Sequence, residues 1–250
     1  MLLLGAGIAV RRAQGTYDAR PTFDASRVIG MSLRLHMQGY DEAHARQFQE
    51  RLRARIAAMP QAASVTLATA MPLSNSVGWF RVDLEGRPPV GSDYNAISPT
   101  FFPTLGTVVV RGRGFTAEDR EGGAPVALVN EDFARRYWPG EEAVGKRIRL
   151  TTSAAFFEVV GVAPDFEDAF ADFRSSGQFR RFNSVRPTIY VPQSQAALFL
   201  SGVRPETPPY EMQLLVRAVG SDGAENRNAS GGARGRSTVA RHCPDTRGDD

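Results

Sequence analysis

The stretch most suggestive of chemistry is "GEEAVGKR", residues 140–147, in which two glycines four residues apart precede a lysine, as in a nucleotide-binding P-loop. That motif also needs a serine or threonine after the lysine to hold Mg²⁺, and an apolar strand before the loop. Here Arg147 occupies the serine position, and the preceding "NEDFARRYW" has a helical pattern. Glu141 and Glu142 would also repel phosphate. We therefore predict a turn between a helix and a strand, without a nucleotide site.

Other residue types that carry chemistry are few and scattered. The three histidines, His36, His44 and His242, show no metal-ligand spacing, and each is expected to be a solvated or incidental side chain. Cys243 is the single cysteine, which excludes an intrachain disulfide and a cysteine-based zinc site. No Gly-x-Ser-x-Gly motif occurs. We therefore predict no catalytic residue, no metal site and no cofactor, and we expect that the protein is not an enzyme.

Three charged stretches are candidate binding sites. "EDREGG" and "PDFEDAFAD" are acidic but lack the ligand spacing of a calcium loop, so solvated loops are expected. "FRSSGQFRRFNSVRP" interleaves arginine with phenylalanine, a pattern that could stack on single-stranded nucleic acid or contact lipid headgroups. The formal net charge is only +3, so no wide basic field supports a nucleic-acid partner. A surface loop is the expectation for this stretch too.

The elements that must position these residues begin with a strand, a helix and a second strand. With 250 residues, 42% hydrophobic, the chain can form one sizeable domain or two small ones. Residues 27–37 alternate like a strand, and residues 63–73 form another. Between them, residues 40–60 show a helical face on which apolar residues recur three or four apart, namely Ala45, Phe48, Leu52, Ile56 and Met59. Pro60 ends this helix, and its apolar face needs a sheet to cover.

The remainder up to residue 218 is rich in short strands. We expect strands at residues 79–86, 94–98, 107–112, 124–130, 146–150, 156–165, 187–192 and 211–218. Asn130 is placed as the N-cap of a short helix over residues 131–138. A polar loop is expected through Arg181. The pattern predicts a mixed α+β fold with strands in the majority.

The two ends of the chain differ in character. "MLLLGAGIAVRR" is apolar for ten residues, which span about 15 Å as a helix, half of a bilayer core of about 30 Å. It is therefore either a buried segment, which composition alone favours, or the last half of a membrane-spanning helix. From residue 219 to 250 large apolar residues and periodicity are nearly absent, and we predict a disordered tail.

The stretches read together resemble a known family. The segment "ISPTFFPTLGTVVVRGRGFTAEDREGGAPVALVNEDFARRYWPGEEAVGKRIRL", from Ile97 to Leu150, is similar to the MacB-like periplasmic core domain of ABC-transporter permeases, above all the large duplicated permeases. "EVVGVAPD" and "IYVPQSQ" continue the resemblance in the expected order. It also covers the beginning, which looks like the family's transition from a membrane helix into the core. Arg11 and Arg12 would then face outside the cell, against the positive-inside tendency.

The resemblance implies a domain organisation. Residues 1–19 would be the end of a truncated transmembrane helix and a linker, residues 20–218 the periplasmic core, and residues 219–250 the atypical tail of a fragment. The core would be α+β, with a βαβ-type layer from about Arg27 to Leu73, completed by the strand near Met212. A strand-rich subdomain would be inserted over about residues 77–195. Its two crossings to the layer would allow hinge motion.

The resemblance also implies a function. The chain would be the non-catalytic extracytoplasmic core of a permease in the inner (plasma) membrane, on its periplasmic or extracellular side. It would couple motion of transmembrane helices to substrate export or mechanotransmission. Its partners would be a separate cytoplasmic ATPase subunit, the membrane and a second permease copy, with no nucleic acid. The alternative is a soluble extracytoplasmic binding or adaptor domain with the same architecture.

Overall fold

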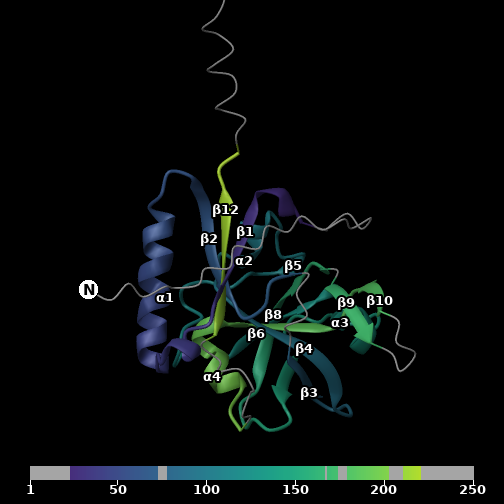
Figure 1. Ribbon diagram of the computed structural model, residues 1–250. Coiled ribbons are helices and arrows are strands. Elements are labelled where there is room, and N and C mark those ends of the chain that lie inside the picture. Colours follow the sequence, from purple (N-terminus) through teal and green to yellow (C-terminus); the bar gives the residue numbers. More distant parts are fainter. Residues whose placement is uncertain (1–22, 73–77, 167, 174–178, 203–210, 221–250) are drawn as a thin grey trace, which may run out of the picture. The chain divides into compact units, whose positions relative to one another are not determined.

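The computed structural model describes residues 23–72, 78–166, 168–173, 179–202 and 211–220 (Figure 1). The predicted helix end and linker over residues 1–19 lie outside the described residues, as do residues 221–250 of the predicted tail. Within the described part the fold is mixed α+β, as the sequence predicted. Its described strands form one ten-stranded sheet, in which a three-stranded layer continues into a closed six-stranded barrel with one short extra strand, and a separate two-stranded hairpin.

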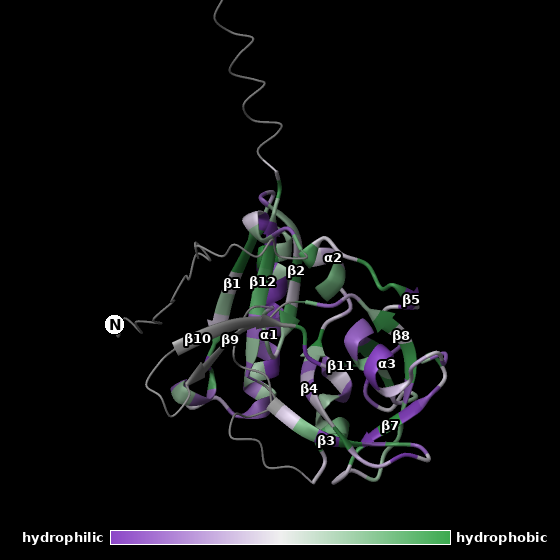
Figure 2. Ribbon diagram, turned by 90° about the vertical axis from the view of Figure 1, so that its right-hand side faces the viewer, coloured by the Kyte–Doolittle hydropathy of each residue, from purple (hydrophilic) through white to green (hydrophobic). Residues whose placement is uncertain are grey.

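The layer is a split strand–helix–strand unit. It consists of β1 (Val28–Leu33), α1 (Glu42–Ala57), β2 (Ala62–Ala68) and β12 (Met212–Ala218). β12 lies between β1 and β2 and is antiparallel to both, so that β1 and β2 run parallel and α1 is the crossover between them (Figure 1). In Figure 2 the strands of this layer are mostly hydrophobic, whereas α1 carries many hydrophilic residues. The predicted completion of the layer by a strand at Met212 is confirmed.

The apolar face of α1 packs on this sheet as expected, with one exception. The Asp41 carboxylate caps the helix by accepting a hydrogen bond from the backbone N–H of His44 at 2.8 Å. Ala45 is fully buried, and Phe48, Leu52 and Ile56 pack against the core formed with β2 and β12. Met59, predicted on the same face, is 51% exposed because the helix ends at Ala57.

Six strands close into a barrel. In order around it they are β4 (Val90–Ile97), β11 (Thr188–Pro192), β6 (Val126–Asn130), β8 (Phe157–Ala163), β7 (Arg147–Leu150) and β3 (Gly78–Leu84), and β3 pairs with β4 to complete the ring. The alternation predicted in β3 places Val82 and Leu84 inside, where they are buried with Tyr94 of β4. Closing the ring leaves these six strands without an open edge between them.

Several elements differ from the sequence-based expectations. The strand expected at residues 107–112 is reduced to β5 (Arg111–Gly112), which pairs with β8, and Val108 is 77% exposed. Before it lies an unpredicted short helix, α2 (Phe101–Leu105), which ends at Gly106 in the left-handed region at a φ of 74°. Of the three valines at residues 108–110, only Val110 reaches β8, where its N–H donates to the Val162 carbonyl at 2.7 Å, and ladder pairing among the described residues begins at Arg111. The β propensity of three consecutive valines therefore did not decide the structure.

The loop expected through Arg181 is instead a two-stranded hairpin. It is formed by β9 (Asp168–Phe173) and β10 (Phe179–Ser184), which pair only with each other among the described strands. The remaining helices are α3 (Glu131–Tyr137), which was predicted, and α4 (Ala196–Phe199), which was not. Three short 3₁₀ turns lie at Ala25–Arg27, His36–Gln38 and Gln193–Gln195.

Candidate functional site

The loop that resembles a P-loop uses its backbone donors internally. It follows α3 and leads into β7, as predicted, and Gly140 and Gly145 both adopt positive φ. The N–H of Val144 donates to the Glu142 carboxylate at 3.1 Å, and the N–H of Gly145 donates to the Val159 carbonyl at 2.8 Å. A phosphate cradle requires such N–H groups to point at the ligand. Here they already have partners in the protein.

The lysine of this loop is likewise engaged. Lys146 Nζ lies 2.6 Å from a Glu141 carboxylate oxygen and 5.9 Å from the centre of the Trp138 ring. The guanidinium of Arg87 binds the other Glu141 oxygen. The hydrogen bond from Lys146, followed by the charge of Arg87, holds the pKa of Glu141 below its ordinary value. Lys146 therefore belongs to a surface ion-pair network, which agrees with the interpretation of the segment as a turn.

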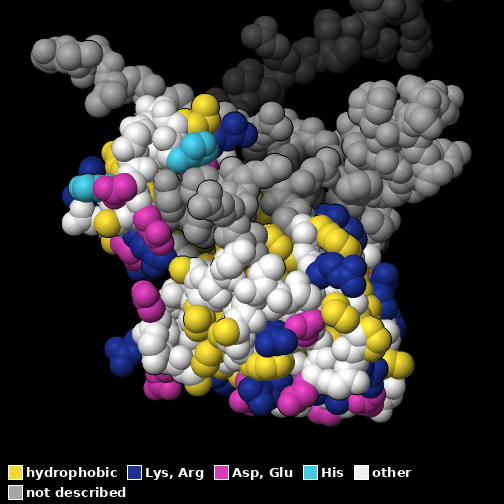
Figure 3. Space-filling view, turned by 90° about the horizontal axis from the view of Figure 1, so that it is seen from below, with side chains coloured by type: hydrophobic (Ala, Val, Ile, Leu, Met, Phe, Trp, Pro, Cys, Tyr) yellow, Lys and Arg dark blue, Asp and Glu magenta, His cyan; other side chains and the backbone are white. Residues whose placement is uncertain are grey.

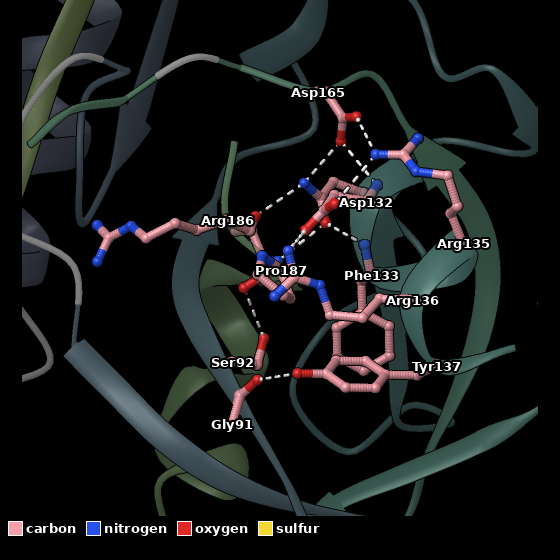
Figure 4. A network of polar contacts seen from close by, with 12 residues as sticks. Gly91, Ser92, Asp132, Phe133, Arg135, Arg136, Tyr137, Asp165, Arg186 and Pro187 are labelled. Carbon is pink, nitrogen blue, oxygen red and sulfur yellow. Dashed lines mark hydrogen bonds and ion pairs between the residues drawn. The ribbon is translucent and has the colours of Figure 1, made fainter. Parts of the chain in front are cut away.

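A denser polar network lies where the parallel strands β6 and β8 end (Figure 4). Asn130, the last residue of β6, uses its whole amide. Its oxygen accepts from the N–H groups of Phe133 at 3.0 Å and Thr188 at 2.9 Å. Its nitrogen donates to Asp165 at 2.8 Å and to the Arg186 carbonyl at 2.9 Å. The predicted N-cap is thus confirmed, and the same side chain also fixes the start of β11.

Carboxylates and guanidinium groups complete this network. Arg135 and Arg136 contact the two oxygens of Asp132 at 3.0 and 3.1 Å. Asp165 accepts the N–H of Asp132 at 2.8 Å and lies 3.5 Å from Arg135. Sequence reasoning did not single out Asp165. A usable signal was that "VALVN" and "GVAPD" are two apolar strands, each ending in a polar residue.

Strand β4, which pairs with β11, contributes a buried ion pair and a hydroxyl. Arg186 Nε lies 2.8 Å from the carboxylate of Asp93, whose side chain is 1% exposed. Ser92 donates to the Pro187 carbonyl at 3.0 Å, and Tyr137 donates to the Gly91 carbonyl at 2.7 Å (Figure 4). These hydroxyls are bound to carbonyl groups and not to a base that could activate them. The network can therefore hold α3, β4, β8 and β11 together, but it has no paired nucleophile and base.

The acidic stretch after β5 is organised by one aspartate. Asp119 receives two hydrogen bonds from the Arg113 guanidinium, at 2.8 and 3.0 Å, and one from the N–H of Thr116 at 2.8 Å. Burial would raise the pKa of Asp119, but these hydrogen bonds outweigh it and hold the pKa below its ordinary value. Gln195 binds the carbonyls of Arg120 and Ala124, at 3.2 and 2.9 Å. The carboxylate thus serves the loop itself and is not turned toward a cation.

Histidines and cavities offer no further site among the described residues. His36 contacts Glu211 and His44 contacts Asp41, while His242 and Cys243 lie outside the described residues. No group of histidine, cysteine or acidic side chains in the described part is placed to hold a metal ion. A small cavity beside Asn95 measures about 20 Å³, enough for about one water molecule. A wider depression over residues 117–123, about 390 Å³, is open to solvent.

Surface charge is mixed in sign. Figure 3 shows basic and acidic side chains interspersed over one face of the described residues, without a field of a single sign. In the stretch that interleaves arginine with phenylalanine, residues 173–187, the side chains as far as Ser184 are not described. The described residues also contain no helix long and apolar enough to cross a membrane.

The family described as the MacB-like periplasmic core domain matches residues 13–227. No curated protein matches the chain. Among solved structures, the periplasmic region of MacB from Actinobacillus actinomycetemcomitans is 18% identical, with 70% of this chain and 68% of that chain covered and a TM-score of 0.45. The extracellular domain of the ABC-type transporter YknZ from Gram-positive bacteria is 14% identical, with 71% and 76% covered and a TM-score of 0.46.

The family match extends over most of the chain and includes both the layer and the barrel. The chain therefore belongs to the family of MacB-like periplasmic core domains, the extracytoplasmic domains of ABC-type permeases.

Proposed function

We propose that this domain couples the motion of transmembrane helices to substrate export or to mechanical work on a partner, without catalysing a reaction itself. The ATP would be hydrolysed by a separate cytoplasmic ATPase subunit, and the permease would lie in the inner (plasma) membrane, with a second permease copy as a further partner. In this proposal residues 1–19 end a membrane-spanning helix, residues 20–218 form the core, and residues 77–195 are inserted in it.

The observation that carries the proposal is the place where the chain enters and leaves the layer. β1 and β12 are neighbours, with Val28 opposite Arg217, so the first residues of one strand lie beside the last residues of the other. Arg217 also binds Asp24 at 3.1 Å, just before β1. If membrane helices precede and follow the core, their motions would act on one edge of one sheet. A displacement of that edge would move the layer as a whole.

Location is the first test. Cys243→Ser removes the single cysteine, and Glu121→Cys then places one thiol on an exposed loop of the barrel. In the permease that carries this domain, we expect a membrane-impermeant maleimide to label residue 121 from the extracytoplasmic side. Protection of this thiol until the inner membrane is lysed would overturn the proposal.

Coupling is the second test. A donor dye at residue 121 and acceptor dyes on outer-leaflet lipids report the height of the barrel above the membrane. In vesicles that contain the permease and its ATPase, we expect the transfer efficiency to change between the nucleotide-free and the ATP-bound state. An ATPase variant that binds ATP weakly is the control. The same efficiency in both states would refute coupling and favour the soluble binding or adaptor domain.

A further inference from the structure

We propose that the layer and the barrel move as one rigid body, locked by residues 98–105, which we call the wedge. The wedge comprises the residues between β4 and α2 together with α2 itself. The inference rests on the proposed function, because it states how motion that reaches the layer is passed to the barrel. The inference therefore argues against the hinge motion that the two chain crossings between the layer and the barrel would allow.

The wedge is covalently part of the barrel but hydrogen-bonded to the layer. It follows directly from β4, and three of its residues bind β2. The N–H of Ser98 donates to the Leu67 carbonyl at 2.9 Å. The hydroxyl of Thr100 donates to the Val65 carbonyl at 2.8 Å. The hydroxyls of Thr104 and Ser64 lie 2.6 Å apart. These contacts extend along β2, so the wedge is attached along a strand and not at a single point.

The opposite side of the wedge is aromatic and packs on the barrel. Phe101 and Phe102 are 1% and 3% exposed. Their ring centres lie 6.1 and 5.4 Å from the ring of Tyr190 in β11, and both lie 6.3 Å from Phe166, which follows β8. The same apolar cluster includes Leu215 of β12. One packed cluster therefore contains side chains of the layer, the wedge and the barrel, and a densely packed core resists relative displacement of its parts.

The first chain crossing is also held to the barrel. Ala68, the last residue of β2, pairs with Ile97 of β4. The N–H of Thr69 donates to the Ala96 carbonyl at 2.9 Å, and its hydroxyl accepts the N–H of Ala96 at 2.8 Å. The N–H of Ala70 then donates to the Asn95 side chain at 3.1 Å. A hinge needs residues that are free to change their backbone angles. These residues are hydrogen-bonded to neighbouring strands, and the small cavity beside them measures only about 20 Å³.

A distance measurement on the 250-residue chain tests the lock. Spin labels at Arg55→Cys on α1 and Glu121→Cys on the barrel loop, with Cys243→Ser, occupy exposed positions in the two parts. We expect one narrow distance distribution by double electron–electron resonance. Phe102→Ala should broaden it at least about twofold, because a cavity in a packed contact gives the parts room to shift. A broad or two-peaked distribution in the unmutated chain would overturn the proposal.

The matched control is Phe133→Ala, which removes another fully buried ring that lies within the barrel cluster. It should leave the distance distribution unchanged. Equal broadening by both variants, or by neither, would contradict the lock. If Phe102→Ala does not fold, the pair Ser64→Ala and Thr104→Val removes one of the three hydrogen bonds between wedge and layer with little change of volume. This experiment needs neither membrane nor ATPase. A narrow distance distribution would therefore support the rigid body even if the height of the barrel above the membrane did not change with ATP. That combination of results would refute only the proposed function.

Discussion

Tyr94 provides the sharpest test of how the barrel interior is built. Its ring stacks on Phe199 with the centres 5.2 Å apart and meets Phe80 edge-on at 5.8 Å. The residue is 6% exposed, and its hydroxyl has no hydrogen-bond partner among the described residues. A buried polar group without a partner costs about 1–3 kcal/mol of folding free energy. Tyr94→Phe removes that group and keeps the stacked ring.

We expect Tyr94→Phe to stabilise the protein. Taking the low end of the cost, because the lost oxygen leaves a small void, the free energy of unfolding should rise by about 1 kcal/mol. In a domain of about 200 residues this corresponds to an increase in Tm of about 2–4 °C. Urea unfolding followed by circular dichroism and by tryptophan fluorescence measures the change. Coincidence of the two probes tests whether unfolding is two-state.

The pH dependence of stability gives an independent test of the burial of the Tyr94 hydroxyl. Burial raises the pKa of Tyr94 far above its ordinary value of 10.0. The hydroxyl then stays protonated in the folded state at a pH where it ionises in the unfolded state. Stability is unaffected by this residue below pH 10 and falls above it, by about 1.4 kcal/mol per pH unit. The unmutated protein should therefore lose stability faster than Tyr94→Phe between about pH 10 and 11.

The control is a second tyrosine-to-phenylalanine substitution, at Tyr137, whose hydroxyl does have a hydrogen-bond partner. The hydroxyl of Tyr137 donates to the Gly91 carbonyl at 2.7 Å. Tyr137→Phe should therefore destabilise the protein by about 0.5–1.5 kcal/mol. A loss of stability in Tyr94→Phe comparable to that in Tyr137→Phe would show that the Tyr94 hydroxyl has a partner, and would refute the reasoning.

Three further predictions concern the loops and the glycine contacts. Asp119→Asn should destabilise by about 1.5–3 kcal/mol in urea unfolding at pH 7, since it weakens charge-assisted hydrogen bonds. Because the pKa of Asp119 is lowered, its contribution is present above about pH 3.8 and should disappear as the pH falls further, so the two proteins should converge in acid. In a titration with a fluorescent ATP analogue, we expect no saturable binding by the unmutated protein or by Lys146→Ala. Saturable binding by the unmutated protein that is lost in Lys146→Ala would restore the P-loop interpretation. Gly161→Ala should cost at least about 2 kcal/mol, because its Cβ would lie 2.5 Å from the Arg113 carbonyl oxygen, whereas Gly122→Ala, at a φ of +80° with open space around it, should cost about 1 kcal/mol in the same assay.

Much of the local structure follows from sequence patterns of short range. The periodicity of residues 40–60 predicted α1, and the alternation in residues 79–86 predicted the inward face of β3. Asn130 was identified as an N-cap because its type and position suffice for that role. The charges and the flanking pattern of "GEEAVGKR" predicted a turn in preference to a P-loop, and the segment does connect α3 to β7. The long stretch of family-specific residues around it pointed to the periplasmic core domain, which the family match confirms.

Other features depend on which strand lies beside which, and short-range patterns do not contain that information. Three consecutive valines at residues 108–110 suggested a strand, but a strand needs a neighbour, and in the described structure pairing with β8 extends only over β5 and the N–H of Val110. The closure of six strands into a barrel depends on the pairing of β3 with β4 and on the parallel pairing of β11 with β4.

The polar network shows the same division between local and long-range information. Its members, Asn130, Asp165 and Arg186, come from separate parts of the chain and meet because β6, β8 and β11 are neighbours in the barrel. The sequence by itself therefore determined α1, α3, most of the strands, the Asn130 cap, the family and the prediction of a turn over residues 140–147. Only the tertiary structure decided the ring of strands, the wedge and the partners of the charged groups, because those contacts join residues far apart in the chain.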